Sequence, residues 1–359
     1  MKILLSFLTV VFFYFQLQAQ DKEDISLMEP VSETIGKLNF FDDENPMDLT
    51  LKYDISRFIR NKRKADYLDA EFCLYFNEGD SIVKNIRLKA RGNFRRGYCF
   101  FPPIYLNFKT DPITVGELEN IKKIKLVTHC KSSKSYQENI IEEYLAYRIY
   151  SLLTEYSFRV KLLNIKYIDT GKKHRNYYQK GFLIEPVELL MKRTNSLELE
   201  SNFINSSNVE APDMDRVALF QYMIGNTDWR IKSGHNMIFV KSMTKLSANV
   251  IPIPYDFDYS GLVDAHYALP QTWTSLKNVT DREYLGYCRE NEQDYLRAVN
   301  LFLQKKEEII QLITDCEYVS DNDRKKMLGY INEFYRQAED QKTILNLLKR
   351  QCKDLDFKP

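Results

Sequence analysis

Alternation of apolar and polar positions is the main pattern in the first half of the chain. Several segments combine β-branched and aromatic residues in partial alternation, and turn-rich stretches such as NEGDS and RGNFRRGY separate them. This pattern is typical of half-buried strands. The strands predicted in this way are 67–76, 82–90, 104–109, 121–127, 158–169 and 177–185.

A helical period replaces this alternation in residues 136–153 and in most of the second half. The segment MDRVALFQYMIG (214–225) is amphipathic and ends at a glycine, which is a common helix stop. Short strands are expected around Asn236 and Ile253, and helices are expected at 281–288, 291–314 and 320–351. The chain is therefore predicted to be an α+β protein with a sheet-rich first half.

The N-terminus has the pattern of a secretory signal over residues 1–20. Lys2 gives a basic start, Ile3 to Leu17 form an apolar run, and Ala19-Gln20 end it. An uncleaved membrane anchor is the alternative, since the run alone does not exclude one. Residues 21–48 are polar and irregular and are expected to form a linker. No later segment is apolar enough to span a bilayer, so we expect an exported protein of the periplasm or cell surface.

The net charge of the chain indicates which kinds of partner it is able to bind. Residues 1–20 hold one of the 51 basic residues and none of the 50 acidic ones, so the mature chain would carry 50 of each. A net charge near zero argues against binding to nucleic acid. The six cysteines form no CxxC pair, which argues against a zinc site. One or two disulfides or several buried free thiols are both consistent with them, and the oligomeric state stays open.

Polar residues that suit metal chemistry gather between Gly225 and Gly261. Asp228, Asn236, Asp256 and Asp258 flank two short apolar runs in GNTDWRIKSGHNMIFV and IPIPYDFDYSG. Two carboxylates and an amide at the ends of neighbouring strands are able to hold Mg²⁺ and leave a third carboxylate as a base. The structural alternative is a pair of turns whose side chains bond their own backbone.

Five segments in this order resemble the secreted CotH-type kinase-fold family, which is known from spore-coat proteins and exported bacterial proteins. They cover roughly residues 82–268 and are LKARGNFRR (88–96), KLVTHC with EEYLAY, FLIE, GNTDW with HN, and PYDFDYSGLV. The resemblance implies a bilobal protein-kinase-like fold. Its sheet-rich N-terminal lobe would span residues 49–186, and its mainly helical C-terminal lobe would span 187–359.

The resemblance also suggests roles for residues of the first half. Lys125 on a strand would orient the phosphates of ATP and would pair with Glu143, with Glu142 and Glu138 as alternatives. Surface charges are the competing interpretation of that pair. A second set of candidate ATP-binding residues consists of Arg91, Gly92 and Asn93 in a turn, and Glu185 at a hinge.

In the second half, Asp228 would accept the proton of the substrate hydroxyl. Asn236 and Asp256 would bind Mg²⁺ or Mn²⁺, with Asp258 as a further ligand. His235 is interpreted as a structural histidine. The spacing departs from ordinary protein kinases, in which the base precedes the metal-binding Asn by five positions, because Asp228 and Asn236 are eight apart.

Three functions remain open at this point. The first is an exported kinase that transfers the γ-phosphate of ATP to a protein or saccharide hydroxyl. The second is a catalytically inactive kinase-fold protein of the cell envelope that serves in binding or assembly. The third is a glycosidase with paired carboxylates, which explains neither Asn236 nor a Lys125–Glu143 pair.

Overall fold

The computed structural model describes residues 39–354 except 78–79, 115, 201–203, 205 and 245–249. The expected signal at 1–20 and most of the expected linker lie outside these residues. The strands of the first half are β1 (Met47–Tyr53), β2 (Leu68–Asn77), β3 (Asp80–Ala90), β4 (Ile104–Asn107), β5 (Lys123–Val127), β6 (Val160–Asp169) and β7 (Asn176–Ile184). Six of them lie where the alternation predicted strands, and β1 begins within the expected linker.

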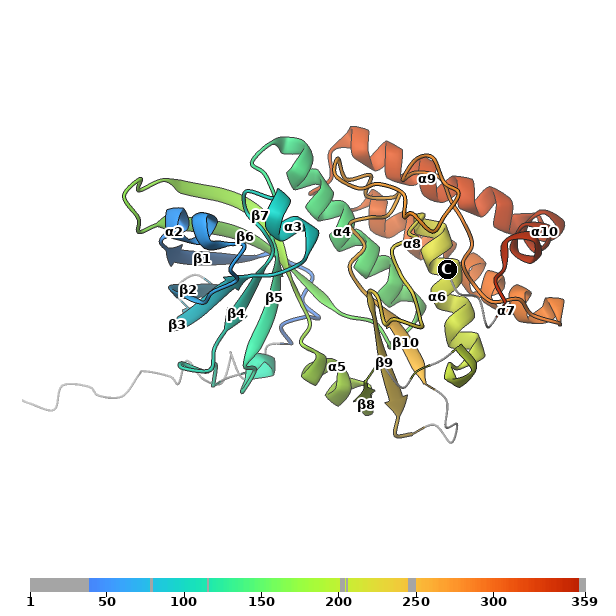
Figure 1. Ribbon diagram of the computed structural model, residues 1–359, viewed down its shortest axis with the longest axis horizontal. Coiled ribbons are helices and arrows are strands. Elements are labelled where there is room, and N and C mark those ends of the chain that lie inside the picture. The colour runs from blue at the N-terminus through green and yellow to red at the C-terminus, as the bar shows by residue number, and fades with distance from the viewer. Residues whose placement is uncertain are drawn as a thin grey trace, which may run out of the picture.

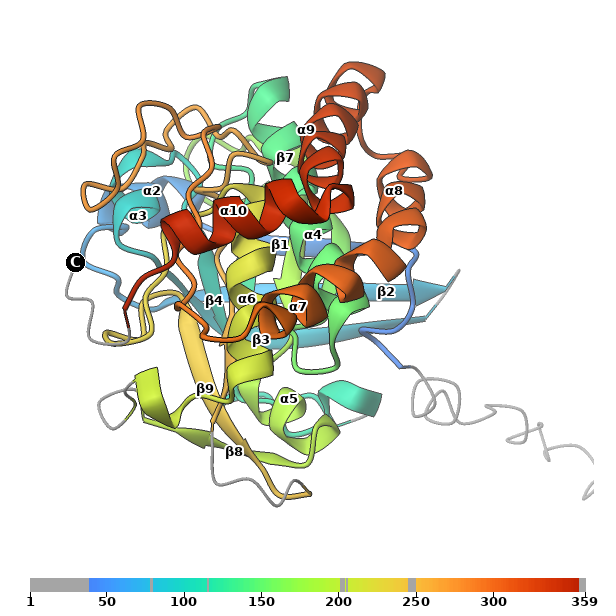
Figure 2. The same cartoon turned by 90° about the vertical axis from the view of Figure 1, so that its right-hand side faces the viewer.

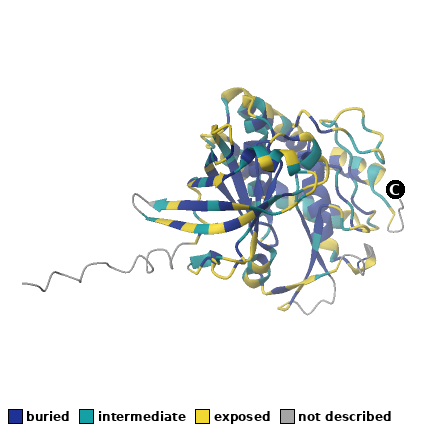
Figure 3. Ribbon diagram, turned by 60° about the vertical axis from the view of Figure 1, so that its left-hand side comes forward, coloured by how far each residue is buried: buried dark blue, intermediate teal, exposed yellow. Residues whose placement is uncertain are grey.

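These strands close into a seven-stranded barrel in the order β1-β2-β3-β4-β5-β7-β6 (Figure 1). The closing contact is a parallel pairing of β1 with β6, from Met47 opposite Leu163 to Tyr53 opposite Asp169. All other neighbouring pairs of the barrel are antiparallel. The barrel explains the alternation, because inward side chains form a core that includes Leu51, Phe72 and Leu106 (Figure 3).

The expected bilobal protein-kinase-like fold is therefore wrong. Its first half is a closed barrel, and the second half carries a sheet of its own in addition to its helices. Local alternation predicted where the strands lie, but it holds no information on which distant strands pair. The division of the chain at residue 186 stays a prediction.

Helix α4 (Lys134–Leu153) lies between the barrel and the helices of the C-terminal part of the chain (Figure 1). One side packs on barrel residues such as Phe182, and the other contacts α6 (Ala211–Ile224) and α8 (Lys306–Thr314). Because both sides are covered, every residue from Ile140 to Tyr147 is buried. The helix thus carries its polar residues into the interior at the boundary of the two halves.

The second half surrounds α6, which Figure 2 shows in front of a small sheet in the order β10-β9-β8. The strands are β8 (Ser196–Leu199), β9 (Met237–Ser242) and β10 (Ile251–Pro254). The second half also contains the helices α5 (Val187–Arg193), α7 (Glu292–Gln304), α9 (Asp321–Glu339) and α10 (Gln341–Gln351). Two short helices belong to the first half, α2 (Ile55–Asn61) and α3 (Phe94–Tyr98).

Three helix predictions of the second half need correction. Residues 281–288 are not helical, and the two long helices are each divided. The divisions fall at Lys305 and at Asp340, whose side chain caps α10 by accepting from the N–H groups of Lys342 and Thr343. A cap of this kind begins a new helix without interrupting the periodic pattern of apolar residues.

Two disulfides join Cys99 to Cys130 and Cys288 to Cys352, while Cys73 and Cys316 are free thiols. The first disulfide ties the end of α3 to the segment after β5. Within the described part of the chain, no helix has both the length and the apolar character needed to cross a membrane.

Candidate functional site

The pairing of β9 with β10 brings the polar residues of the second half together. Met237 at the start of β9 lies opposite Pro254 at the end of β10, so Asn236 and Asp256 meet at one end of this sheet. The N–H of Tyr255 donates to the carbonyl oxygen of Asn236 at 3.0 Å. Asn236 and Asp256 both have left-handed backbones, with φ of 53° and 67°. Asn and Asp tolerate this region better than most residues and hold such turns at little cost.

A short hairpin brings Asp228 to the same place. Arg230 pairs with His235 and reverses the chain, so that the amide nitrogen of Asn236 donates to Asp228 Oδ2 at 3.0 Å. His235 Nε2 lies 2.7 Å from Asp228 Oδ1. Both carboxylate oxygens of Asp228 are thus oriented by neighbours. The hairpin is the physical reason that Asp228 and Asn236 meet although they are eight positions apart.

The turn before this hairpin requires glycine. Gly225 ends α6 with φ of 65°, and its N–H bonds back to the carbonyl of Tyr222. A Cβ atom at this position would collide with the hydroxyl of Tyr330. The carbonyl of Gly225 then accepts from the N–H of Gly261, which connects the Asp228 segment to the turn that follows Asp258.

Three carboxylates form the acidic centre of the site, namely Glu143 of α4 with Asp256 and Asp258 after β10. One oxygen from each lies within 4.8 Å of the others. Glu143 and Asp258 are buried. The second oxygen of Glu143, Oε1, is buried without a hydrogen-bond partner among the described residues. A buried carboxylate oxygen that lacks a donor is an open position for a cation.

Arg95 is the cation that contacts this centre directly. Its Nη1 lies 3.3 Å from Glu143 and 3.6 Å from Asp258. Its Nη2 donates to the carbonyl of Thr128 at 2.9 Å. The hydroxyl of Tyr267 donates to Asp258 Oδ2 at 2.8 Å.

Burial raises the pKa of both Glu143 and Asp258, and repulsion between the acidic side chains adds to this effect, while Arg95 opposes it. Arg95 supplies one positive charge in direct contact with two of the three acids. The atoms that these three side chains offer to a metal ion are carboxylate oxygens, which suit Mg²⁺ or Mn²⁺.

A second group of cations borders the centre on the barrel side. Lys125 of β5 lies with its Nζ 4.7 Å from the ring centroid of Tyr255. Burial and, to a smaller extent, the charge of Arg91 lower the pKa of Lys125 to about 8, whereas Asp256 opposes the shift. Arg91 Nε is buried without a hydrogen-bond partner among the described residues. Two adjacent cations that repel each other favour a ligand with several negative charges.

The expected Lys125–Glu143 pair does not occur among the ion pairs of residues 39–354. Glu143 binds Arg95 instead, and Glu142 accepts from Asn139 while Glu138 pairs with Lys134. The physical reason is that α3 places Arg95 above the buried face of α4.

Two further expectations for ATP binding find no support in the contacts. The buried carboxylate of Glu185 is bound by Arg159 and Arg193, so this side chain joins chain segments. Gly92 and Asn93 are exposed in the turn before α3. Neither has a described contact with the acidic centre.

Sequence reasoning missed the roles of Arg95, Tyr147 and Tyr267. Tyr147, one helical turn beyond Glu143, accepts the N–H of Asp256 at 2.8 Å and fixes the backbone there. Its spacing of four from Glu143 is the signal that both face the same side. Tyr267 lies in an irregular segment that has no periodic signal. Comparisons with models of known protein families and with curated proteins gave no match.

Proposed function

We propose that this protein is an exported phosphotransferase that transfers the γ-phosphoryl group of ATP to a hydroxyl of a protein or saccharide. One observation carries the proposal: an acidic centre of Glu143, Asp256 and Asp258 lies beside the cations Arg91 and Lys125. A nucleotide triphosphate bound with a divalent cation has the complementary charge distribution. The resemblance to the CotH-type family supports the same chemistry, although the fold that it implied was wrong.

Each residue of the site would have a separate role in this reaction. Lys125 and Arg91 hold phosphate oxygens, and Asp256, Asp258, Glu143 and the amide oxygen of Asn236 are the groups that would hold Mg²⁺ or Mn²⁺. The cation, when bound, supplies positive charge to the phosphate oxygens. Asp228 takes the proton of the acceptor hydroxyl as the new oxygen–phosphorus bond forms. The bond from the γ-phosphorus to the bridging oxygen breaks, and ADP leaves.

His235 supports this role of Asp228 by position. Its contact at 2.7 Å fixes one carboxylate oxygen, and the amide of Asn236 fixes the other. A carboxylate that is held in one orientation loses little freedom when it meets the acceptor hydroxyl.

The second candidate function is a binding or assembly protein without catalysis. The contacts of Arg95 favour it, because this guanidinium already neutralises part of the acidic centre. A site that is balanced in this way remains folded without a metal ion.

Thermal unfolding with ATP and Mg²⁺, with ATP alone and with Mg²⁺ alone tests the proposal. ATP together with Mg²⁺, at ~100 times the dissociation constant of the complex, should add about 2.7 kcal/mol to the free energy of unfolding. Asp256→Asn should remove this gain, because it takes away a charged ligand while Asn tolerates the same backbone. Asp264→Asn is the matched control, since Asp264 is exposed and also has a positive φ of 46°.

Labelling with radioactive ATP separates the two candidate functions. Asp228→Asn should retain the thermal shift and lose the transfer of label or the hydrolysis of ATP. Wild-type protein that binds ATP with Mg²⁺ or Mn²⁺ but shows neither reaction would support the non-catalytic function. Absence of any nucleotide-dependent shift with either cation would overturn the phosphotransferase proposal.

A further inference from the structure

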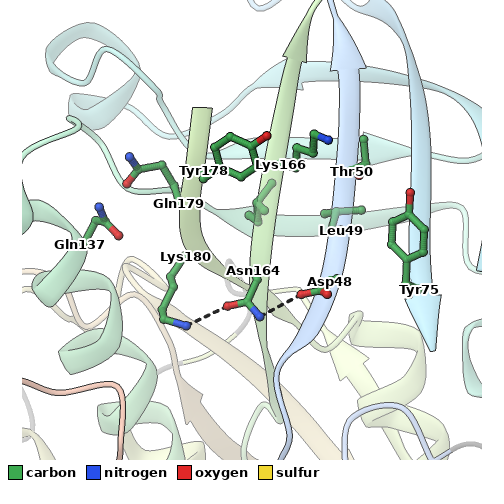
Figure 4. A pocket seen from close by; sticks show the side chains of 11 residues that line it. Asp48, Leu49, Thr50, Tyr75, Gln137, Asn164, Lys166, Tyr178, Gln179 and Lys180 are labelled. Atoms are coloured by element: carbon green, nitrogen blue, oxygen red, sulfur yellow. Dashed lines mark hydrogen bonds between the residues drawn. The ribbon is translucent and has the colours of Figure 1, made fainter. Parts of the chain in front are cut away.

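A pocket of about 550 Å³ lies on the outer face of the barrel, away from the residues of the candidate site. Strands β2, β1, β6 and β7 form its floor, and Gln137 of α4 lies at one side (Figure 4). None of the residues that line it belongs to the acidic centre or to its cations. The pocket therefore needs an explanation of its own.

The register of the strands arranges its polar side chains in two rows. Asp48 lies opposite Asn164, which lies opposite Lys180. Asn164 donates to Asp48 at 2.9 Å and accepts from Lys180 at 2.8 Å, as the dashed lines in Figure 4 show. In the second row, Thr50 lies opposite Lys166, which lies opposite Tyr178.

Two tyrosines stand at opposite sides of these rows in Figure 4. Tyr178 is 66% exposed and Tyr75 is 43% exposed, which is high for such large side chains. Lys166 forms no ion pair among the described residues, and its Nζ lies 5.8 Å from the ring of Tyr178. The pocket thus offers flat apolar rings beside hydrogen-bonding groups and beside side chains of positive and negative charge.

This combination fits one class of ligand better than others. A protein partner requires an interface centre with few charged groups, yet Asp48, Lys166 and Lys180 all line this pocket. A nucleic acid requires a marked excess of cations, whereas Asp48 offsets one of the two lysines that line this pocket. The carboxylate of Asp48 already accepts from Asn164, and no second acid among the described residues lines the pocket to help hold a metal ion. A sugar ring presents C–H groups on its face and hydroxyl groups at its edge. The tyrosine rings and the Asp48–Asn164–Lys180 row match these two surfaces.

We propose that this outer pocket of the barrel binds a saccharide chain, with Tyr75 and Tyr178 against sugar rings and Asp48, Asn164 and Lys166 bonded to their polar groups. The site is independent of the phosphotransferase site and does not require that activity. A pocket of this volume accommodates a few sugar units.

Saturation-transfer NMR on the full-length protein tests the proposal with three soluble hexasaccharides, made of glucose, of N-acetylglucosamine and of galacturonic acid. At least one should receive saturation from the protein. Tyr178→Ala and Tyr75→Ala should each weaken its binding by about tenfold, as expected for loss of a central aromatic contact. Lys166→Met should weaken galacturonate binding selectively if the carboxylate of that sugar meets Lys166.

Phe100→Ala is the matched control, because Phe100 is 43% exposed and does not line the pocket. It should leave saccharide binding unchanged, and circular dichroism should confirm that every variant is folded. The proposal is overturned if no hexasaccharide binds, or if binding survives in the Tyr75→Ala, Tyr178→Ala double variant. It is also overturned if sedimentation shows a dimer that Tyr178→Ala dissociates, because the pocket would then be covered by a second copy.

Discussion

His129 places an imidazole ring in an apolar environment at the edge of the candidate site. The ring is fully buried and contacts Phe101, with 4.5 Å between the ring centroids. Neither ring nitrogen has a hydrogen-bond partner among the described residues. Burial and, to a smaller extent, the charge of Arg95 lower the pKa of His129 to about 3. The folded protein therefore holds a neutral histidine that would become charged on unfolding in mild acid.

The pH dependence of stability follows from this shift. The unfolded chain binds a proton at His129 below pH ~6.5, whereas the folded protein binds it only near pH ~3, so stability falls as the pH decreases through this window. We predict that His129 alone removes about 2 kcal/mol of unfolding free energy between pH 7 and pH 5. His129→Phe should abolish this contribution and should raise stability at neutral pH by about 1 kcal/mol, since it removes an unsatisfied polar group.

Urea unfolding of wild type and His129→Phe at several pH values measures the effect. His174→Asn serves as the control, because His174 is exposed and its positive φ of 46° suits Asn. Parallel pH profiles for wild type and His129→Phe would contradict the prediction. The sequence shows a histidine in KLVTHC, but only the packing around it shows that the ring is buried among apolar side chains.

At the scale of elements, α3 owes its position to the Cys99–Cys130 disulfide. Cys99 follows the last residue of this five-residue helix, and its N–H donates to the carbonyl of Arg95. The N–H of Phe101 donates to the carbonyl of Cys130. So short a helix has little stability of its own. The disulfide and these bonds therefore hold the segment that carries Arg95 to Glu143.

We predict that the Cys99→Ser, Cys130→Ser double variant loses about 2–4 kcal/mol of unfolding free energy. If the proposed function is correct, it also loses affinity for ATP with Mg²⁺, because Arg95 no longer holds Glu143 and Asp258 in place. Denaturant unfolding and calorimetric titration measure the two effects separately.

The Cys288→Ser, Cys352→Ser variant is the comparison, since this disulfide joins two segments of the second half that do not line the candidate site. It should lose stability and keep its affinity for ATP with Mg²⁺. Equal loss of affinity in both variants would show that Arg95 is not held specifically by the first disulfide.

For the whole molecule, the decisive contact is the closure of the barrel by β1 and β6. Strand β1 pairs with β2 on one edge and with β6 on the other. In an open sheet with β1 at its edge, alternate N–H groups of β1 would face solvent. In the closed barrel, successive N–H groups of β1 bond to the two neighbours in turn.

Hydrogen–deuterium exchange followed by NMR tests the closure directly. We predict slow exchange for consecutive amides of β1, with protection close to the free energy of global unfolding. β8 provides an internal comparison, since it lies at the edge of its sheet and should show alternate protection. Alternate protection along β1 would mean that the barrel is open.

The positions of most strands and helices were predictable, because side-chain periodicity depends on which face of an element is buried. The helix expected at 136–153 is α4, and the segment 214–225 contains most of α6. The short helices α2, α3 and α5 were not predicted, since five to seven residues give too few turns for a period to appear. The non-helical segment 281–288 was predicted wrongly on the same kind of short pattern.

The sequence by itself determined the local structure and the residue types of the candidate site, including the acids and amide of the segment 225–261. Chemistry and spacing along the chain are sufficient for this. The tertiary structure alone decided that β1 pairs with β6, and that Arg95 rather than Lys125 is the partner of Glu143. The pairing of strands and of buried charges depends on distances between segments far apart in sequence, and no local pattern encodes those distances.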